Sequence, residues 1–128
     1  MNAKPKWTTE ELGAISTADD LKISPLRDDG KTYGTPTWIW NVAVKGELYV
    51  RGYHGVKSRW YQAALKHPNG RIHAAGLVKD VIFEPVSPGT IQDLVNKAYQ
   101  TKYKTNPFVP AMISEKAQAA TIRILPAF

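Results

Sequence analysis

"TPTWIWNVAVKGELYVRGY", residues Thr35–Tyr53, is the stretch that decides the fold. Two runs rich in β-branched and aromatic residues flank the pair Lys45 and Gly46, a pattern typical of a β-hairpin with a tight turn. A two-residue loop at this pair places Val42 opposite Tyr49 and sets the register of the whole hairpin. A three-residue loop would shift that register by one residue and mix the side chains of the two faces.

The two faces of the predicted hairpin differ in character, because this register also places Trp40 opposite Arg51 and Trp38 opposite Tyr53. One face carries Trp38, Trp40, Val42, Tyr49, Arg51 and Tyr53. The other carries the smaller set Ile39, Asn41, Ala43, Leu48 and Val50. Since the interior of a small barrel is filled by modest side chains, we expect the bulky face to point outward. Aromatic residues and arginine are enriched at interfaces, so a second subunit, a ligand or both are expected to cover it.

The segments around the hairpin predict a barrel with helices packed outside it. Thr8 opens a helix over residues 8–18, with Glu11 completing a capping box. Two more helices are expected, capped by Ser58 and by Thr90. Strands are expected in "LKISPL", "RIHAAGLVKDVIFEPV" and "ATIRILP". Because strands outnumber helices, the predicted fold class is mainly β with α, a β-barrel with about three peripheral helices.

Length and composition limit the classes of protein. With 128 residues the chain suits one domain, expected over residues 1–128 with its core at about 20–126. The absence of cysteine excludes disulfides and thiolate catalysis, and the three histidines lack metal-ligand spacing, so no metal site is predicted. No apolar run is long enough for a membrane span, and we expect a cytoplasmic protein. The net charge of +6 is spread along the chain without a nucleic-acid motif, which disfavours nucleic acid as a partner.

A candidate anion site follows the hairpin in "HGVKSRW", residues 54–60. Amides at a helix start lack internal acceptors, and the helix dipole favours negative charge there. Lys57 and Arg59 add positive charge, and Ser58 adds a hydroxyl, so the segment is a candidate phosphate cradle. The alternative is that Ser58 merely caps a surface helix whose cations are solvated. Arg51 is a second candidate, because its guanidinium can fork onto a phosphate or stack on a ring.

These stretches, from "GTPTWIW" through "LYVR" and "SRWYQAA" to "FEPV", resemble the DUF2255 family of small bacterial proteins. More distantly, the order of elements is similar to the deazaflavin-dependent nitroreductases, which belong to the FMN-binding split-barrel group. The positions that match are Thr35, Pro36, the Tyr49–Tyr53 strand, Ser58, Trp60 and Tyr61. The resemblance implies a split barrel that holds its cofactor against the barrel, with the phosphate near the strand end and the following loop. The basic, glycine-rich run that precedes "TP" in those reductases is reduced here to "RDDGKTYG".

The leading hypothesis is therefore a split-barrel homodimer that binds FMN or the deazaflavin F420 and passes a hydride or electrons to a small organic acceptor. Arg51, Lys57, Ser58 and Arg59 are expected to hold the phosphate, and Trp38, Trp40 and Tyr53 to wall the ring system. The full set of expected cofactor-binding residues is Thr35, Trp38, Trp40, Arg51, Tyr53, Lys57, Ser58, Arg59 and Trp60. No side chain is nominated as a catalytic acid or base, because the cofactor carries the chemistry.

Two alternatives stay open at this point. The first is a binding or interaction module of the same fold that has lost the cofactor and holds a small anionic molecule. The second, ranked lower, is single-stranded nucleic-acid binding on the aromatic and basic face.

Overall fold

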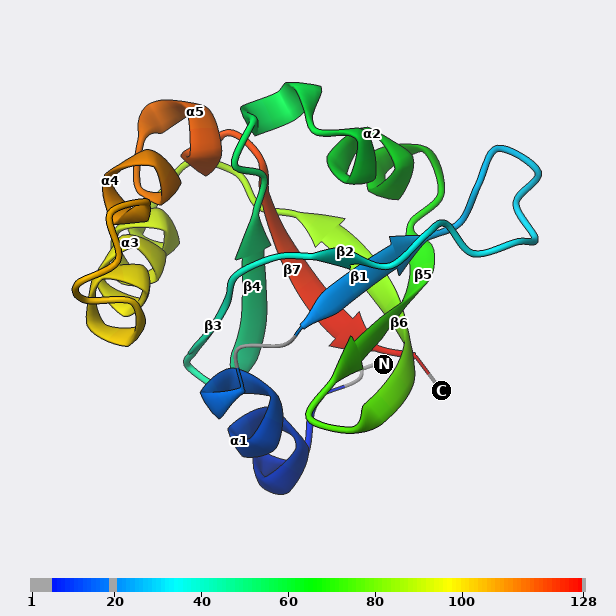
Figure 1. Ribbon diagram of the computed structural model, residues 1–128, viewed down its shortest axis with the longest axis horizontal. Helices are drawn as coiled ribbons and strands as arrows, with labels where there is room; N and C mark the ends of the chain where they lie inside the picture. Colours follow the sequence, from blue (N-terminus) through cyan, green and yellow to red (C-terminus); the bar gives the residue numbers. More distant parts are fainter. Residues whose placement is uncertain (1–5, 19–20, 128) are drawn as a thin grey trace.

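The computed structural model describes residues 6–18 and 21–127 and shows a curled antiparallel sheet with helices around it (Figure 1). The strands are β1 (Lys22–Pro25), β2 (Thr37–Trp38), β3 (Asn41–Val44), β4 (Glu47–Arg51), β5 (Asn69–Ala74), β6 (Leu77–Pro85) and β7 (Thr121–Pro126). The helices are α1 (Thr9–Thr17), the 3₁₀ helix η1 (Gly55–Lys57), α2 (Arg59–Lys66), α3 (Thr90–Lys102), α4 (Val109–Met112) and α5 (Glu115–Gln118). The predicted mainly β class is confirmed. Residue 20, where the core was expected to start, lies outside the described residues.

The capping predictions have different outcomes at the three helices. At α1 the capping box is confirmed, since Glu11 N–H donates to Thr8 Oγ1 at 3.1 Å and Thr8 N–H donates to Glu11 Oε1 at 3.2 Å. At α3 the prediction is wrong, because Gly89 precedes the helix and Thr90 is its first residue. Ser58 does precede α2, but its side chain makes no capping hydrogen bond. Its hydroxyl is therefore left for another partner.

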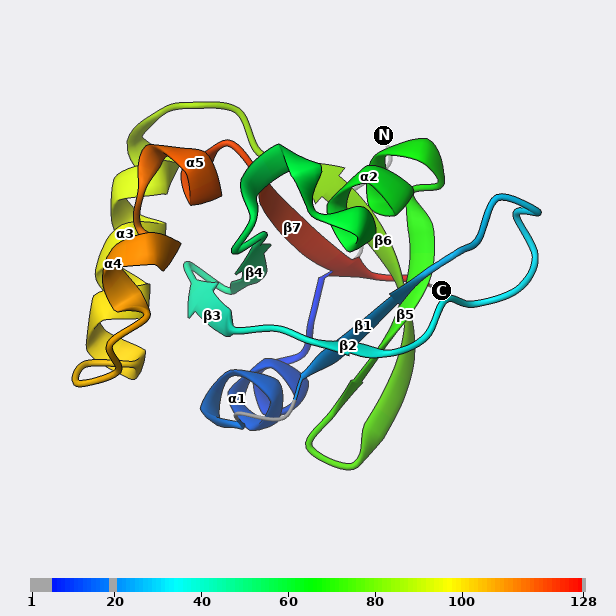
Figure 2. The same ribbon diagram turned by 45° about the horizontal axis from the view of Figure 1, so that its top comes forward.

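One short connection closes the sheet into a barrel. The strand order is β2-β1-β5-β6-β7-β4-β3, and neighbouring strands are antiparallel. The edge strands β2 and β3 are separated along the chain only by Ile39 and Trp40. A residue spans at most about 3.6 Å, so the two edges must lie close together and the sheet must curl. We call Thr37–Val44 the seam segment; it runs along both edges (Figures 1 and 2).

The register of the hairpin is confirmed where the two strands pair. Val42 lies opposite Tyr49, and the turn holds only the two residues Lys45 and Gly46. Both turn residues have positive φ, 50° and 79°, as the favoured two-residue hairpin turn requires. The inward and outward faces are therefore assigned as the sequence pattern predicts.

The predicted pairing is wrong farther from the turn, where the pairs Trp40–Arg51 and Trp38–Tyr53 do not form. Pairing of β3 with β4 stops at Asn41 and Val50. Beyond that point the chain crosses to the opposite edge of the sheet, where Trp38 pairs with Lys22 of β1. Closure of the barrel thus takes the seam segment away from β4.

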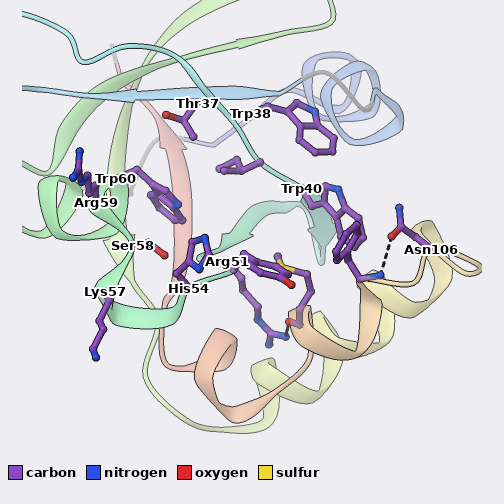
Figure 3. Close-up of a pocket in the computed structure, with 14 residues that line it drawn as sticks. Thr37, Trp38, Trp40, Arg51, His54, Lys57, Ser58, Arg59, Trp60 and Asn106 are labelled. Atoms are coloured by element: carbon purple, nitrogen blue, oxygen red, sulfur yellow. Dashed lines mark hydrogen bonds between the residues drawn. The ribbon is translucent and has the colours of Figure 1, made fainter.

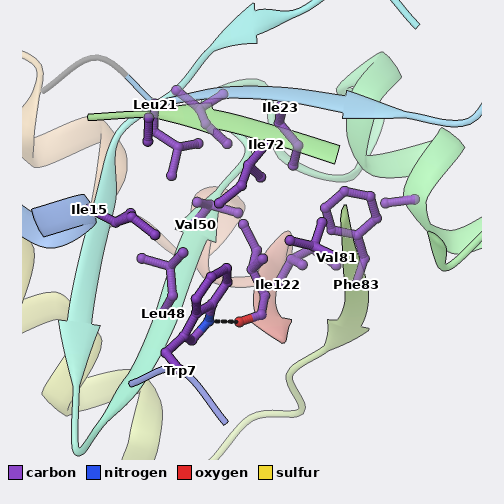
Figure 4. Close-up of a cluster of buried hydrophobic side chains, with 14 of the residues drawn as sticks. Trp7, Ile15, Leu21, Ile23, Leu48, Val50, Ile72, Val81, Phe83 and Ile122 are labelled. Atoms are coloured by element: carbon purple, nitrogen blue, oxygen red, sulfur yellow. Dashed lines mark hydrogen bonds between the residues drawn. The ribbon is translucent and has the colours of Figure 1, made fainter. Parts of the chain in front are cut away.

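The smaller face of the hairpin fills the barrel (Figure 4). Leu48 and Val50 are fully buried there with branched side chains from the other strands, including Ile23, Ile72 and Ile122. Each such side chain contributes about 1.5–3 kcal/mol when it is fully buried. Trp7 joins the same core, and its Nε1–H donates to the carbonyl oxygen of Ile124 at 2.8 Å.

The bulky face points out of the barrel, as predicted, but the chain's own helices cover most of it. Trp40, Val42 and Tyr49 pack in a second core with Val95, Tyr99, Tyr103, Val109 and Met112 from the α3–α4 region. The Trp40 and Tyr103 rings stack with centroids 4.1 Å apart and planes 7° apart. Trp38 and Tyr53 remain half-exposed, at 50% and 44%. The cover expected from a second subunit or ligand is thus needed only for this smaller remainder.

Arg51 joins the sheet to these covering helices. The side chain is 1% exposed, and each of its five N–H groups donates to an acceptor of the chain. The acceptors are Thr121 Oγ1 (3.0 Å), Asn96 Oδ1, the Met112 carbonyl (3.1 Å), and the Gln92 carbonyl and Oε1 (3.2 and 2.7 Å). One residue thereby links β4 to β7, α3 and α4. Hydrogen bonds from a charged donor are roughly twice as strong as neutral ones, so this network fixes the cover in place.

We predict that Arg51→Lys destabilises the fold by about 2–4 kcal/mol, because an ammonium has three donors and leaves several of these buried acceptors unpaired. The matched control is Arg71→Lys, which changes an arginine paired with Asp80 at the surface of β5 and should cost far less. Urea unfolding followed by tryptophan fluorescence measures both. Equal effects of the two substitutions would show that the Arg51 network does not hold the helices.

Candidate functional site

A cavity of about 780 Å³ opens between the seam segment, the η1–α2 segment and the chain around α4 (Figure 3). Of the expected cofactor-binding residues, all but one line it: Trp38, Trp40, Arg51, Tyr53, Lys57, Ser58, Arg59 and Trp60. The exception is Thr35, which lies exposed before β2 and outside the cavity. Closure of the barrel brings the lining residues of the seam segment, Trp38 and Trp40, across the cavity from those of the η1–α2 segment, which are Lys57, Ser58, Arg59 and Trp60.

Other lining residues were missed by the sequence reasoning: Thr37, Ile39, His54, Asn106, Phe108 and Met112. Thr37 lines the cavity where Thr35 was expected. Alternation along β2 does not predict it, because Thr37 stands next to Trp38 and neighbouring residues of a strand point to opposite faces. Asn106 and Phe108 come from the irregular connection after α3, "YKTNPFVPA". Nothing local marks that loop as part of a site, because only the packing of α3 on the barrel brings it to the cavity.

The walls of the cavity are aromatic. Trp60 lies on one side, and Trp38 and Trp40 lie on the other (Figure 3). At the mouth, Tyr53 and Phe108 are 44% and 54% exposed, and their rings meet edge to face with centroids 5.9 Å apart. Ligand sites of this size are typically lined by apolar and aromatic side chains with a few placed polar groups. The arrangement suits a planar ring system.

The start of α2 provides the polar end. Ser58 N–H donates to the Gly55 carbonyl, and the first bond inside the helix runs from Gln62 N–H to the Ser58 carbonyl. The amides of residues 59–61 therefore precede the regular helical bonds and are oriented toward the helix entrance. Ser58 is 6% exposed, and its Oγ has no hydrogen-bond partner among the residues that the structure describes. An unpaired buried hydroxyl costs about 1–3 kcal/mol, so a ligand atom that pairs with it gains that much.

Gly52 makes room for this hydroxyl. A Cβ atom at position 52 would lie 2.6 Å from Ser58 Oγ and 3.0 Å from the carbonyl oxygen of Gly55. Gly55 itself has φ +67°, a conformation that glycine adopts without strain. The two glycines thus let the chain turn back sharply and bring Ser58 to the edge of the cavity.

The three cations expected to hold the phosphate all line the cavity, but their charged ends differ in orientation and in partners. Lys57 and Arg59 are at the rim, and Figure 3 shows their charged ends directed away from the rings. Arg51 lies at the floor, where all its N–H groups already donate to the protein. Burial lowers the pKa of the Arg51 guanidinium, yet an arginine stays charged at any ordinary pH. Arg51 therefore has no N–H group left to donate directly to a phosphate.

The sequence analysis predicts neither a metal site nor a membrane span. Within residues 6–18 and 21–127, no group of three or more histidine, aspartate or glutamate side chains is arranged to hold a metal ion. Over the same residues, no helix has the length and apolar character needed to span a membrane.

Comparison with solved structures identifies the fold. The conserved hypothetical protein Rv2991 from Mycobacterium tuberculosis aligns over all of this chain and 84% of its own, with a TM-score of 0.61 and 13% identity. A FAD-binding protein from Mesorhizobium loti, mll6688, aligns over 99% of this chain and 95% of its own, with a TM-score of 0.56 and 16% identity. ChuZ from Campylobacter jejuni aligns over 93% of this chain, with a TM-score of 0.67 and 11% identity, but the match spans 52% of ChuZ. The split-barrel fold is confirmed.

Sequence comparison identifies the family. No curated protein matches the chain significantly. A family model does match residues 11–124. This range includes all the strands except for the last two residues of β7, and it includes every residue that lines the cavity. The chain belongs to DUF2255, a family described as uncharacterised proteins conserved in bacteria.

Proposed function

We propose that the cavity binds a flavin-type cofactor, FMN or the deazaflavin F420, with its rings between the tryptophan walls and its phosphate at the start of α2. One observation carries the proposal: an aromatic cavity of ligand size ends at a helix entrance whose buried Ser58 hydroxyl has no partner among the described residues. Helix N-termini bind phosphate through their free amides and their dipole. The FAD-binding protein from M. loti shares the fold, which supports the proposal.

The residues of this chain would bind and orient such a cofactor. Trp60 on one side and Trp38 on the other would hold the rings, while Ser58 and the amides that follow it would bind the phosphate. Lys57 and Arg59 at the rim would raise the local concentration of anions without contacting the rings. When bound, the cofactor would supply hydride or electron transfer to a small organic acceptor, and the half-exposed mouth leaves room for one.

We further propose that the protein is a homodimer, because Trp38, Tyr53 and Phe108 form an apolar mouth that the helices leave uncovered. Exposed apolar patches of this kind are typical of interaction or ligand sites.

A second function, a cofactor-free module that holds a small anionic metabolite, is favoured by one observation. Of the four residues first expected to hold phosphate, Arg51 has all its donors occupied, and Lys57 and Arg59 point outward. The remaining phosphate set is the hydroxyl of Ser58 and the helix amides. A smaller set of this kind also suits a carboxylate or sulfate ester.

The first prediction from this proposal is that the purified protein binds FMN or F420 with saturable quenching of the ligand's fluorescence. The expected affinity is micromolar or better, since the cavity would bury most of the ring system. Titration of each cofactor, with riboflavin as the form that lacks the phosphate, makes the measurement. A protein that binds none of the three would remove the flavin proposal and leave the anionic-metabolite module.

The second prediction isolates the phosphate end. Ser58→Ala should weaken FMN binding by about tenfold or more, because one hydrogen bond to a charged group is lost, and should leave riboflavin binding unchanged. The matched control is Ser24→Ala, which also removes a buried hydroxyl without a hydrogen-bond partner, but in β1 and away from the cavity. If both variants bind FMN like the parent protein, the phosphate does not reach the start of α2.

A further inference from the structure

The charge of Arg51 has no countercharge among the described residues. Its acceptors are a hydroxyl, two side-chain amides and two carbonyls, all of them neutral. Arg123, on the neighbouring strand β7, shows the usual alternative, because it is flanked by Glu47 at 2.8 Å and Glu84 at 2.6 Å. Hydrogen bonds to neutral groups satisfy the donors of a buried cation, but they do not cancel its charge. Arg51 is thus a net positive charge fixed in a buried place.

That charge lies directly below the cavity. Arg51 and Met112 both line the cavity. Arg51 lies at the floor, and its guanidinium extends away from the tryptophan rings toward α3 and α4 (Figure 3). The lining residues include Lys57 and Arg59 as further cations and no carboxylate. The entrance of α2 adds the positive end of a helix dipole from another side. Because the walls are mainly aromatic and apolar, these charges are screened less than at an open surface, and we expect a positive potential at the floor of the cavity.

We infer that Arg51 is a specificity-determining residue that acts through space: its uncancelled charge makes the cavity prefer planar ligands whose ring system carries negative charge over the neutral form of the same rings. The inference rests on the proposed function only in taking this cavity as the ligand site. It requires neither a phosphate at Ser58 nor a flavin as the ligand. For a redox cofactor, the same preference favours the form of the rings that holds more negative charge.

The structure offers a nearly isosteric way to cancel the charge. Asn96→Asp replaces an acceptor of Arg51 by a carboxylate while keeping its size, and Asn96 is not a lining residue. Gln92→Glu is a poorer choice, because the Gln92 amide also donates to the Val86 and Ser87 carbonyls, which would then face a carboxylate. Asn69→Asp, an exposed change at the start of β5, is the control for the same change in net charge.

The test compares two fluorescent probes that share their ring system, anilinonaphthalene sulfonate, which carries an anionic sulfonate on the rings, and its uncharged parent phenylnaphthylamine, which lacks that group. The parent protein should bind the sulfonate more tightly. Asn96→Asp should reduce that preference roughly fivefold or more and leave the neutral probe unchanged, whereas Asn69→Asp should alter neither. Trp38→Ala should weaken both probes, because it removes a wall of the cavity.

Several results would overturn the inference. They are an unaltered preference in Asn96→Asp, a parent protein that prefers the neutral probe or fails to bind the sulfonate, and binding that Trp38→Ala does not weaken. Circular dichroism and urea unfolding establish that Asn96→Asp keeps the fold, which the new ion pair with Arg51 favours. FMN titration separates the two proposals. If the protein binds FMN but Asn96→Asp leaves the probe preference unaltered, only the proposed role of Arg51 is excluded. If Asn96→Asp shifts the preference but the protein does not bind FMN, only the flavin proposal is excluded.

Discussion

The arrangement of this protein depends on five hydrogen bonds from one buried guanidinium. Arg51 stands at the end of β4, where the barrel, the covering helices and the floor of the cavity meet. A buried cation needs many acceptors, and these come from separated parts of the chain, β7, α3 and α4. The network therefore fixes the orientation of the cover relative to the sheet, which apolar packing alone leaves less well defined. The same residue lines the cavity, so its charge lies next to the space where we propose that a ligand binds.

The outward aromatic face has two uses that the structure separates in space. The part near the turn, with Tyr49 and Val42, is covered by α3 and α4 and is structural. The part at the far end, with Trp38 and Tyr53, stays half-exposed and borders the cavity. A single run of large side chains thus includes core residues at one end and residues of the cavity wall at the other. The division falls at Trp40, which stacks on Tyr103 and also lines the cavity.

Local patterns in the sequence predicted the parts of the fold that are decided locally. The turn at Lys45–Gly46, the hairpin register around Val42 and the capping box at Thr8 depend on neighbours within a few residues, and each is present. Eight of the fourteen residues that line the cavity were among the expected cofactor-binding residues, since they lie at the ends of two recognisable segments, and six were missed. What failed depends on contacts across the chain. The departure of Trp38 to another strand follows from barrel closure, and the occupied donors of Arg51 follow from the packing of α3, a helix far along the sequence.

The seam segment has a consequence for how such a chain is able to vary. Because only Ile39 and Trp40 separate β2 from β3 along the chain, the length of this connection limits how far apart the two edges of the sheet can lie. An added residue would allow the two edges of the sheet to move apart. It would also turn the side chains that follow it to the opposite face, which would remove residues from both the cavity wall and the core. Surface connections ordinarily absorb insertions, and the projecting arm between β1 and β2 has that freedom (Figure 1). The seam segment does not, so an insertion there would change the cavity wall and the barrel core together, whereas an insertion in the projecting arm would leave both in place.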